Sequence, residues 1–243
     1  MKVLLLSTST VYGKPYLEYC TSLLEDFYSN IKNLLFVPYA RPGGMTYDDY
    51  TAVAATRFEK LGIKTTGIHE NDNPTKSIQD AEAMFIGGGN TFFLLNELYA
   101  NDLIFTIRDA VKYGMLYMGT SAGSNVGGLT VNNTNDMPII YPPSFKSLGL
   151  LPFNLNPHYL DPNPDSKHKG ETRETRIKEF FTLEQNNQPV VGLREGSGLL
   201  LKDNKLRLTG DLSARIFENE KEPYELNPTD DFNFLIKEHS ESF

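Results

Sequence analysis

Uninterrupted apolar runs alternate with helix-like stretches along the first half of this 243-residue chain. Such runs lack the apolar–polar alternation of a strand with one exposed face, and they predict strands that are buried on both faces. Buried strands separated by helices are typical of a parallel sheet with helices on both sides. Strands are expected over residues 2–7, 33–40, 64–69, 83–89 and 115–119. Helices are expected over residues 16–28, 47–62, 90–101 and 103–114.

The pattern loosens after residue 128. A loop, a strand and a loop that becomes a helix are expected next, over residues 132–144, 151–159 and 161–181. Residues 189–210 have the pattern of hairpin strands, with Asp203 and Asn204 at a tight turn. No repeat or linker divides the chain. We therefore expect one α/β domain over residues 1–243, with a mostly parallel central sheet, helices on both faces and an additional C-terminal β-hairpin region.

Charge and composition exclude several classes of function. The formal net charge is −8 and no run of Lys and Arg stands out, which argues against a nucleic-acid-binding protein. No apolar run is long enough to span a bilayer, and the N-terminus lacks the pattern of a secretory signal. Cys20 is the single cysteine, so no intrachain disulfide is possible. We expect a cytoplasmic monomer or homodimer without a nucleic-acid or membrane partner.

One serine lies among small residues directly after an expected strand. Residues 119–123 read Gly-Thr-Ser-Ala-Gly, which matches the G-x-S-x-G nucleophile elbow. In that motif the serine sits on a sharp strand-to-helix turn, where glycines avoid clashes and the helix N-terminus favours developing negative charge. Ser121 is therefore a candidate nucleophile, although the pattern also fits a glycine-rich turn without chemistry.

A serine nucleophile needs a base, and the chain has four histidines. His158 follows an apolar strand through Pro157, at the edge where sites form in α/β sheets, and it is the favoured general base. His69 ends a strand away from that point. We expect His168 and His239 to be solvated, because they lie in a charged loop and in a polar C-terminal tail.

Two acids are candidates to orient the imidazole of His158. Asp136 lies in a turn-like loop, where its ordinary role is an Asx-turn. Glu195 lies at a strand end next to a glycine, where a solvated carboxylate is the ordinary outcome. Spacing along the chain does not choose between them.

The elbow also needs donors for an oxyanion. The N–H of Ala122, directly after the nucleophile, is one candidate. The glycine turn over residues 86–91 supplies another, because successive glycines leave backbone N–H groups free. A phosphate cradle is the weaker interpretation of this turn, since it lacks the Lys-Ser/Thr of a P-loop.

Several sequence blocks occur together, in order, along nearly the whole chain. They are LLLSTST, VPYA, TGIH, GGGNTF, GTSAG, TNDMPI, NPHY, HKGETRETRI and VVGLREG. On these blocks the chain resembles the peptidase E family of aspartyl dipeptidases, which are serine hydrolases. The resemblance implies a three-layer sandwich like that of class I glutamine amidotransferases. It also implies cleavage of short peptides, chiefly Asp-X dipeptides, after an N-terminal aspartate. We expect no cofactor, and no metal either, since His168 and its neighbours show no metal-ligand spacing.

The resemblance further implies a role for individual residues. They are the nucleophile Ser121, the base His158, the acid Asp136 or Glu195, the oxyanion amides of Gly89 and Ala122, and the substrate-binding Arg173. A guanidinium fork matches the aspartyl carboxylate in two parallel hydrogen bonds. Without the resemblance, Arg173 reads as one partner of a surface pair on its own helix. Many relatives carry tryptophan where Thr120 stands, so the resemblance does not predict the shape of the pocket beside the nucleophile.

Two other functions fit the same residues. A related serine peptidase of different specificity, such as a cyanophycinase-like enzyme, would share Ser121 and His158 without needing Arg173. A non-catalytic small-molecule-binding protein would use Ser121 only as a hydrogen-bond partner. We also expect the loop over residues 161–170 to fold over the site and to restrict the length of the substrate.

Overall fold

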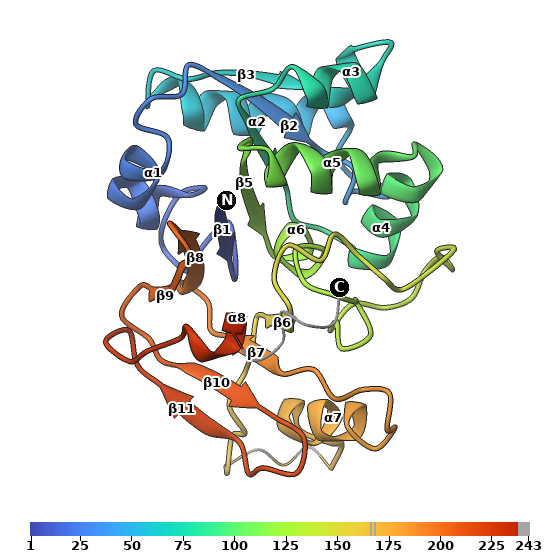
Figure 1. Ribbon diagram of the computed structural model, residues 1–243, viewed down its shortest axis with the longest axis vertical. Coiled ribbons are helices and arrows are strands. Elements are labelled where there is room, and N and C mark those ends of the chain that lie inside the picture. Colours follow the sequence, from blue (N-terminus) through green and yellow to red (C-terminus); the bar gives the residue numbers. More distant parts are fainter. Residues whose placement is uncertain (166, 168, 238–243) are drawn as a thin grey trace.

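Five parallel strands, in the order β3-β2-β4-β5-β1, form one side of a seven-stranded sheet that has β3 at its edge. A computed structural model, which describes residues 1–165, 167 and 169–237, shows this arrangement (Figure 1). Next to β1 the sheet continues with two antiparallel pairings, β1 with β8 and β8 with β9. The strands are β1 (Lys2–Leu6), β2 (Asn33–Val37), β3 (Lys64–Gly67), β4 (Ala83–Ile86), β5 (Leu116–Thr120), β8 (Gly198–Lys202) and β9 (Lys205–Thr209).

Helices cover both faces of this sheet, because neighbouring residues of a strand point to opposite sides. In β1, Val3 and Leu5 belong to the apolar cluster that contains helices α4 (Thr91–Ala100) and α5 (Leu103–Lys112). Leu4 and Leu6 belong to the cluster that contains α1 (Thr21–Phe27) and α2 (Tyr47–Glu59). All four side chains are buried, which is why the strand is apolar throughout. The expected α/β class, with a mostly parallel sheet between helical layers, is confirmed.

The helices are short. They are α1 (Thr21–Phe27), α2 (Tyr47–Glu59), α3 (Pro74–Gln79), α4 (Thr91–Ala100), α5 (Leu103–Lys112), α6 (Ala122–Asn125), α7 (Arg173–Phe180) and α8 (Phe234–Lys237), with 3-10 turns η1 (Glu18–Cys20) and η2 (Ile68–Glu70). In the part of the chain that the structure describes, no helix is long and apolar enough to cross a membrane.

A second, four-stranded sheet lies below the first in Figure 1, in the order β11-β10-β7-β6. Its strands are β6 (Asn154–Pro157), β7 (Val190–Leu193), β10 (Ala214–Phe217) and β11 (Tyr224–Leu226). β6 and β7 are parallel, and β10 is antiparallel to both of its neighbours. Helix α7 packs on this sheet through Ile177 and Phe180, which form one apolar cluster with Tyr159, Val190 and Phe217. That all these layers form one domain stays a prediction.

The expected hairpin over residues 189–210 is divided between the two sheets. Its first part is β7 of the second sheet, and its remainder is the β8–β9 hairpin, which pairs with β1 of the first. Gly196, with a φ of +88°, lies in the turn where the chain passes from one sheet to the other. Asp203 and Asn204 both have positive φ, as a tight two-residue hairpin turn requires.

Helix α6 lies very close to the main sheet at Gly123, and a substitution there tests how close this contact must be. A Cβ at this position would stand 2.1 Å from the carbonyl oxygen of Ile86 in β4. The change Gly123→Ala is therefore expected to lower the free energy of unfolding by about 2 kcal/mol or more, because backbone would have to move. Gly43→Ala, where no atom lies within 4 Å of the added Cβ, should change it by less than about 0.5 kcal/mol. Urea denaturation of both variants measures this, and equal stabilities would contradict the proposed close contact.

Candidate active site

Ser121 occupies the turn between β5 and α6. Its backbone has φ 51° and ψ −113°, a conformation that residues with a side chain rarely adopt. The flanking glycines make this turn possible, because a Cβ at Gly119 would stand 2.3 Å from the carbonyl oxygen of Gly123. The N–H of Ser121 donates to the carbonyl of Leu6 at the end of β1, at 3.1 Å. The serine side chain is thus held on a short, strained turn at the carboxyl ends of two parallel strands.

The imidazole of His158 contacts the Ser121 hydroxyl. The distance from His158 Nε2 to Ser121 Oγ is 2.9 Å, although 37 residues separate the two in sequence. His158 follows β6 and has a positive φ of 54°, which turns its side chain out of the strand direction. A neutral imidazole with its proton on Nδ1 accepts the hydroxyl proton at Nε2, which is the arrangement that a general base requires.

Glu195 is the acid that contacts this imidazole. Its Oε1 lies 2.7 Å from His158 Nδ1, at the turn that follows β7. The His158 and Glu195 side chains are 38% and 49% exposed, so water reaches both ends of this hydrogen bond. Of the two acids that the sequence leaves open, Glu195 is the one placed to hold the Nδ1–H tautomer.

Asp136 lies at a different part of the site. Its Oδ2 accepts the N–H of Thr91, the first residue of α4, at 2.7 Å, and lies 3.5 Å from Thr134 Oγ1. Its negative charge also acts on the guanidinium of Arg173. Asp136 therefore binds the first N–H of the helix that follows the glycine turn, and it makes no contact with the imidazole among the described residues.

Ser7 joins the two sheets at this point. Its Oγ accepts the N–H of His158 at 2.9 Å and donates to the carbonyl of Leu193, the last residue of β7, at 2.8 Å. Ser7 is fully buried and directly follows β1, whose Leu6 pairs with Thr120 of β5. Ser7 lies in the LLLSTST block, but no role is predicted for it from the sequence. Its position directly after an apolar strand is the signal that could have found it.

The glycine turn after β4 lies against the nucleophile. A Cβ at Gly88 would stand 3.0 Å from Ser121 Cβ, so no larger residue fits there without a shift. Tyr50 of α2 fixes this turn, since its hydroxyl oxygen accepts the N–H of Gly88 at 2.8 Å. A Cβ at Gly89, which has a φ of +152°, would meet the carbonyl oxygen of Ala40 at 2.1 Å.

Neither expected oxyanion donor is used by a protein acceptor in the described part of the chain. Among residues 1–165, 167 and 169–237, the N–H groups of Gly89 and Ala122 donate to no protein acceptor. Ala122 is the first residue of α6, where an N–H has no partner within the helix. Two free donors from turns on either side of Ser121 are what an oxyanion hole needs.

Arg173 begins helix α7, behind the N-cap Thr172. Burial lowers the pKa of its guanidinium, as does Arg176, whereas Asp136 and Tyr159 act in the opposite direction. Within the described residues it forms no hydrogen bond and no ion pair. The surface pair with a glutamate of its own helix is absent there, because Glu174 is bound by Arg215 and Lys178. A half-buried cation with unused donors is free to bind an anionic ligand.

The remaining candidates lie elsewhere. Thr120 is buried in β5, and its hydroxyl has no hydrogen-bond partner among the described residues. His69 pairs with Asp48 at 2.9 Å. His168 and His239 lie outside the described residues, and the closing role expected for residues 161–170 stays a prediction. No group of three or more His, Cys, Asp or Glu in the described part of the chain could hold a metal ion.

Comparisons with known proteins show which family the chain resembles along nearly its whole length. The model of peptidase family S51 matches residues 3–209. The chain is 45% identical to peptidase E of Streptomyces coelicolor, over 97% of this chain and 95% of that protein. It is 43% identical, over 97% of both proteins, to the "Probable alpha-aspartyl dipeptidase" of Drosophila melanogaster. Its fold resembles a peptidase from an acI-B1 actinobacterium, with a TM-score of 0.68 and 20% identity over 94% of this chain and 95% of that chain. The chain therefore belongs to peptidase family S51.

Proposed function

We propose that this chain is a serine dipeptidase that hydrolyses the peptide bond after an N-terminal aspartate. One observation carries the proposal: Ser121, His158 and Glu195 form a hydrogen-bonded series, and Arg173 is a cation without a protein partner among the described residues. The near full-length similarity to proteins named for peptidase E and for an alpha-aspartyl dipeptidase supports it.

Acylation of Ser121 is the first half of the proposed reaction. His158 Nε2 takes the hydroxyl proton while Ser121 Oγ attacks the carbonyl carbon of the aspartyl residue. The N–H groups of Gly89 and Ala122 bind the resulting oxyanion. His158 then gives the proton to the leaving nitrogen as the C–N bond breaks, and the second residue departs with a free amino group. An aspartyl ester of Ser121 remains.

Deacylation repeats these steps with water as the nucleophile. His158 takes a proton from water, and the hydroxyl oxygen attacks the ester carbonyl. Collapse of the second oxyanion breaks the bond to Ser121 Oγ, which receives its proton back from His158. Free aspartate is released and the site returns to its starting state. Glu195 balances the imidazolium charge in both halves without itself taking up the proton.

Opposite charges in the site match the two charges of an N-terminal aspartyl residue. Arg173 supplies a cation for the β-carboxylate. Asp136, beside the glycine turn and close enough to influence Arg173, supplies an anion for the α-ammonium group. The two substrate charges are attached to neighbouring carbon atoms, so a matched pair of protein charges orients the scissile carbonyl toward Ser121.

The proposed partner is thus a small peptide with a free N-terminal aspartate. No step of this reaction draws on a cofactor. The expected cytoplasmic location, and the choice between monomer and homodimer, stay predictions.

Replacing Arg173 tests the specificity. Wild-type protein should hydrolyse Asp-Leu far faster than Asn-Leu, and Arg173→Ala should lower kcat/KM for Asp-Leu about a hundredfold while leaving Asn-Leu nearly unchanged. Arg176→Ala is the matched control, because Arg176 is an exposed arginine of the same helix that pairs with Glu171. Equal turnover of both peptides by the wild type would favour a related peptidase of different specificity.

Replacing each acid separates orientation of the base from substrate recognition. Glu195→Gln should slow all substrates about a thousandfold, together with labelling of Ser121 by a fluorophosphonate, because the imidazole loses its anionic partner. Asp136→Asn should lower kcat/KM for aspartyl p-nitroanilide, but not for succinyl p-nitroanilide, which is the same compound without its amino group. An equal loss on both anilides in Asp136→Asn would overturn the role assigned to Asp136. Absence of fluorophosphonate labelling in the wild type would favour a non-catalytic binding protein.

A further inference from the structure

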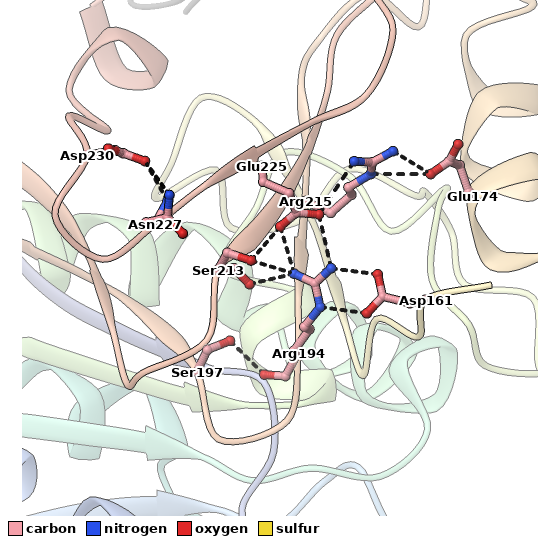
Figure 2. A network of polar contacts seen from close by, with 9 residues as sticks. All are labelled: Asp161, Glu174, Arg194, Ser197, Ser213, Arg215, Glu225, Asn227 and Asp230. Carbon is pink, nitrogen blue, oxygen red and sulfur yellow. Dashed lines mark hydrogen bonds and ion pairs between the residues drawn. The ribbon is translucent and has the colours of Figure 1, made fainter. Parts of the chain in front are cut away.

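Two arginines and three carboxylates form a continuous set of ion pairs on the second sheet (Figure 2). The members of this Arg194–Arg215 network are Asp161, Glu174, Arg194, Arg215 and Glu225. They come from the segments after β6 and β7, from helix α7 and from strands β10 and β11. None of these five residues has a role in the proposed reaction.

Arg194 is the centre of one half of the network. Its Nε and Nη2 donate to the two carboxylate oxygens of Asp161 at 2.8 and 2.6 Å, and its Nη1 and Nη2 donate to Glu225 at 2.9 and 3.0 Å. Nη1 also donates to the carbonyl of Ser213 at 2.7 Å. The side chain is only 16% exposed. Hydrogen bonds to Asp161 and Glu225 raise the pKa of the guanidinium, and the bond from Arg194 lowers the pKa of the Asp161 carboxyl.

Arg215 is the centre of the other half. Its Nη2 and Nε donate to Glu174 Oε2 at 2.9 and 3.2 Å, and its Nη1 reaches Glu225 Oε1 at 3.5 Å. Glu225 therefore bridges the two arginines. The Arg215 and Glu174 side chains are both largely shielded from water, which makes their pairing stronger than that of an exposed pair.

Each end of the network is adjacent in sequence to a residue of the site. Arg194 directly precedes Glu195, and Glu174 directly follows Arg173. Asp161 comes three residues after His158. The backbone positions of the acid, the base and the substrate-binding arginine are thus all linked to one set of forked hydrogen bonds.

We propose that the Arg194–Arg215 network sets the positions of Glu195 and Arg173 for the reaction, with Arg194 as a positioning residue for Glu195 and Arg215 as a positioning residue for Arg173. The inference rests on the proposed function of those two residues. Glu195 lies in a turn and Arg173 at the first residue of a short helix, so neither is fixed by a strand or by the middle of a helix. Small displacements of such groups cost much of their effect.

The two halves predict different kinetic defects. Arg215→Met removes the ion pair with Glu174 on α7 and so displaces Arg173, which binds the aspartyl carboxylate. KM for aspartyl p-nitroanilide should therefore rise about tenfold. The values of kcat and of the fluorophosphonate labelling rate should stay within about twofold of wild type. Arg194→Met removes the ion pairs that hold the turn before Glu195, and so displaces the acid that orients the base His158. Both kcat and the labelling rate should therefore fall about tenfold. A loss of stability alone would not divide KM from kcat in this way.

The experiment measures KM, kcat, the rate of fluorophosphonate labelling and the melting temperature for both variants. Arg215→Lys keeps the charge and should recover part of the KM. Lys76→Met is the control, because it removes an exposed ion pair with Asp80 on α3, and all four quantities should stay at wild-type values. If Arg194→Met does not fold, Arg215→Met decides the proposal.

Unchanged KM in a folded Arg215→Met, or a parallel fall of every rate in both variants, would overturn the proposal. Failure of the proposed function gives a different result. In that case wild-type protein would not turn over the aspartyl anilide. The labelling rate of Arg194→Met would still show whether Arg194 positions Glu195.

Discussion

The hydrogen bond between Ser121 and His158 depends on two sheets meeting at the carboxyl ends of their strands. Ser121 follows strand β5 of the seven-stranded sheet, whereas His158 and Glu195 follow the parallel strands β6 and β7 of the four-stranded one. The buried hydroxyl of Ser7 closes this junction, since it binds the backbone of His158 and of Leu193. The position of the base relative to the nucleophile is therefore set by the packing of the two sheets, together with the positive-φ turns at Ser121 and His158.

Close backbone contact is the second requirement of the site. The elbow, the glycine turn and helix α6 approach one another so closely that a single added Cβ at Gly119 or Gly123 would overlap main-chain atoms. This compactness puts two free N–H groups, those of Gly89 and Ala122, on turns that flank one hydroxyl. Donors fixed in this way need no rearrangement when negative charge develops, which is the main advantage of backbone groups over mobile side chains.

The parts of the fold that the sequence predicts are those with a local pattern. Apolar strands such as residues 2–7 and the elbow around Ser121 carry their own signals, and both are present. The acid could not be chosen, because Asp136 and Glu195 lie on opposite sides of His158 in sequence and only the packing of β6 beside β7 brings one of them to the imidazole. The second sheet could not be predicted from the sequence either. Its strands have only three or four residues each, and β7 has the same apolar pattern as the hairpin that follows it.

The backbone conformation of Ser121 also restricts which chemical groups this turn can present. Threonine carries the same hydroxyl, but its branched Cβ is a poor fit to a positive φ, so hydroxyl chemistry at this position is confined to serine. Cysteine is unbranched at Cβ and meets no such barrier. The turn therefore selects nucleophiles by branching at Cβ: it excludes threonine, and it permits replacement of serine by cysteine.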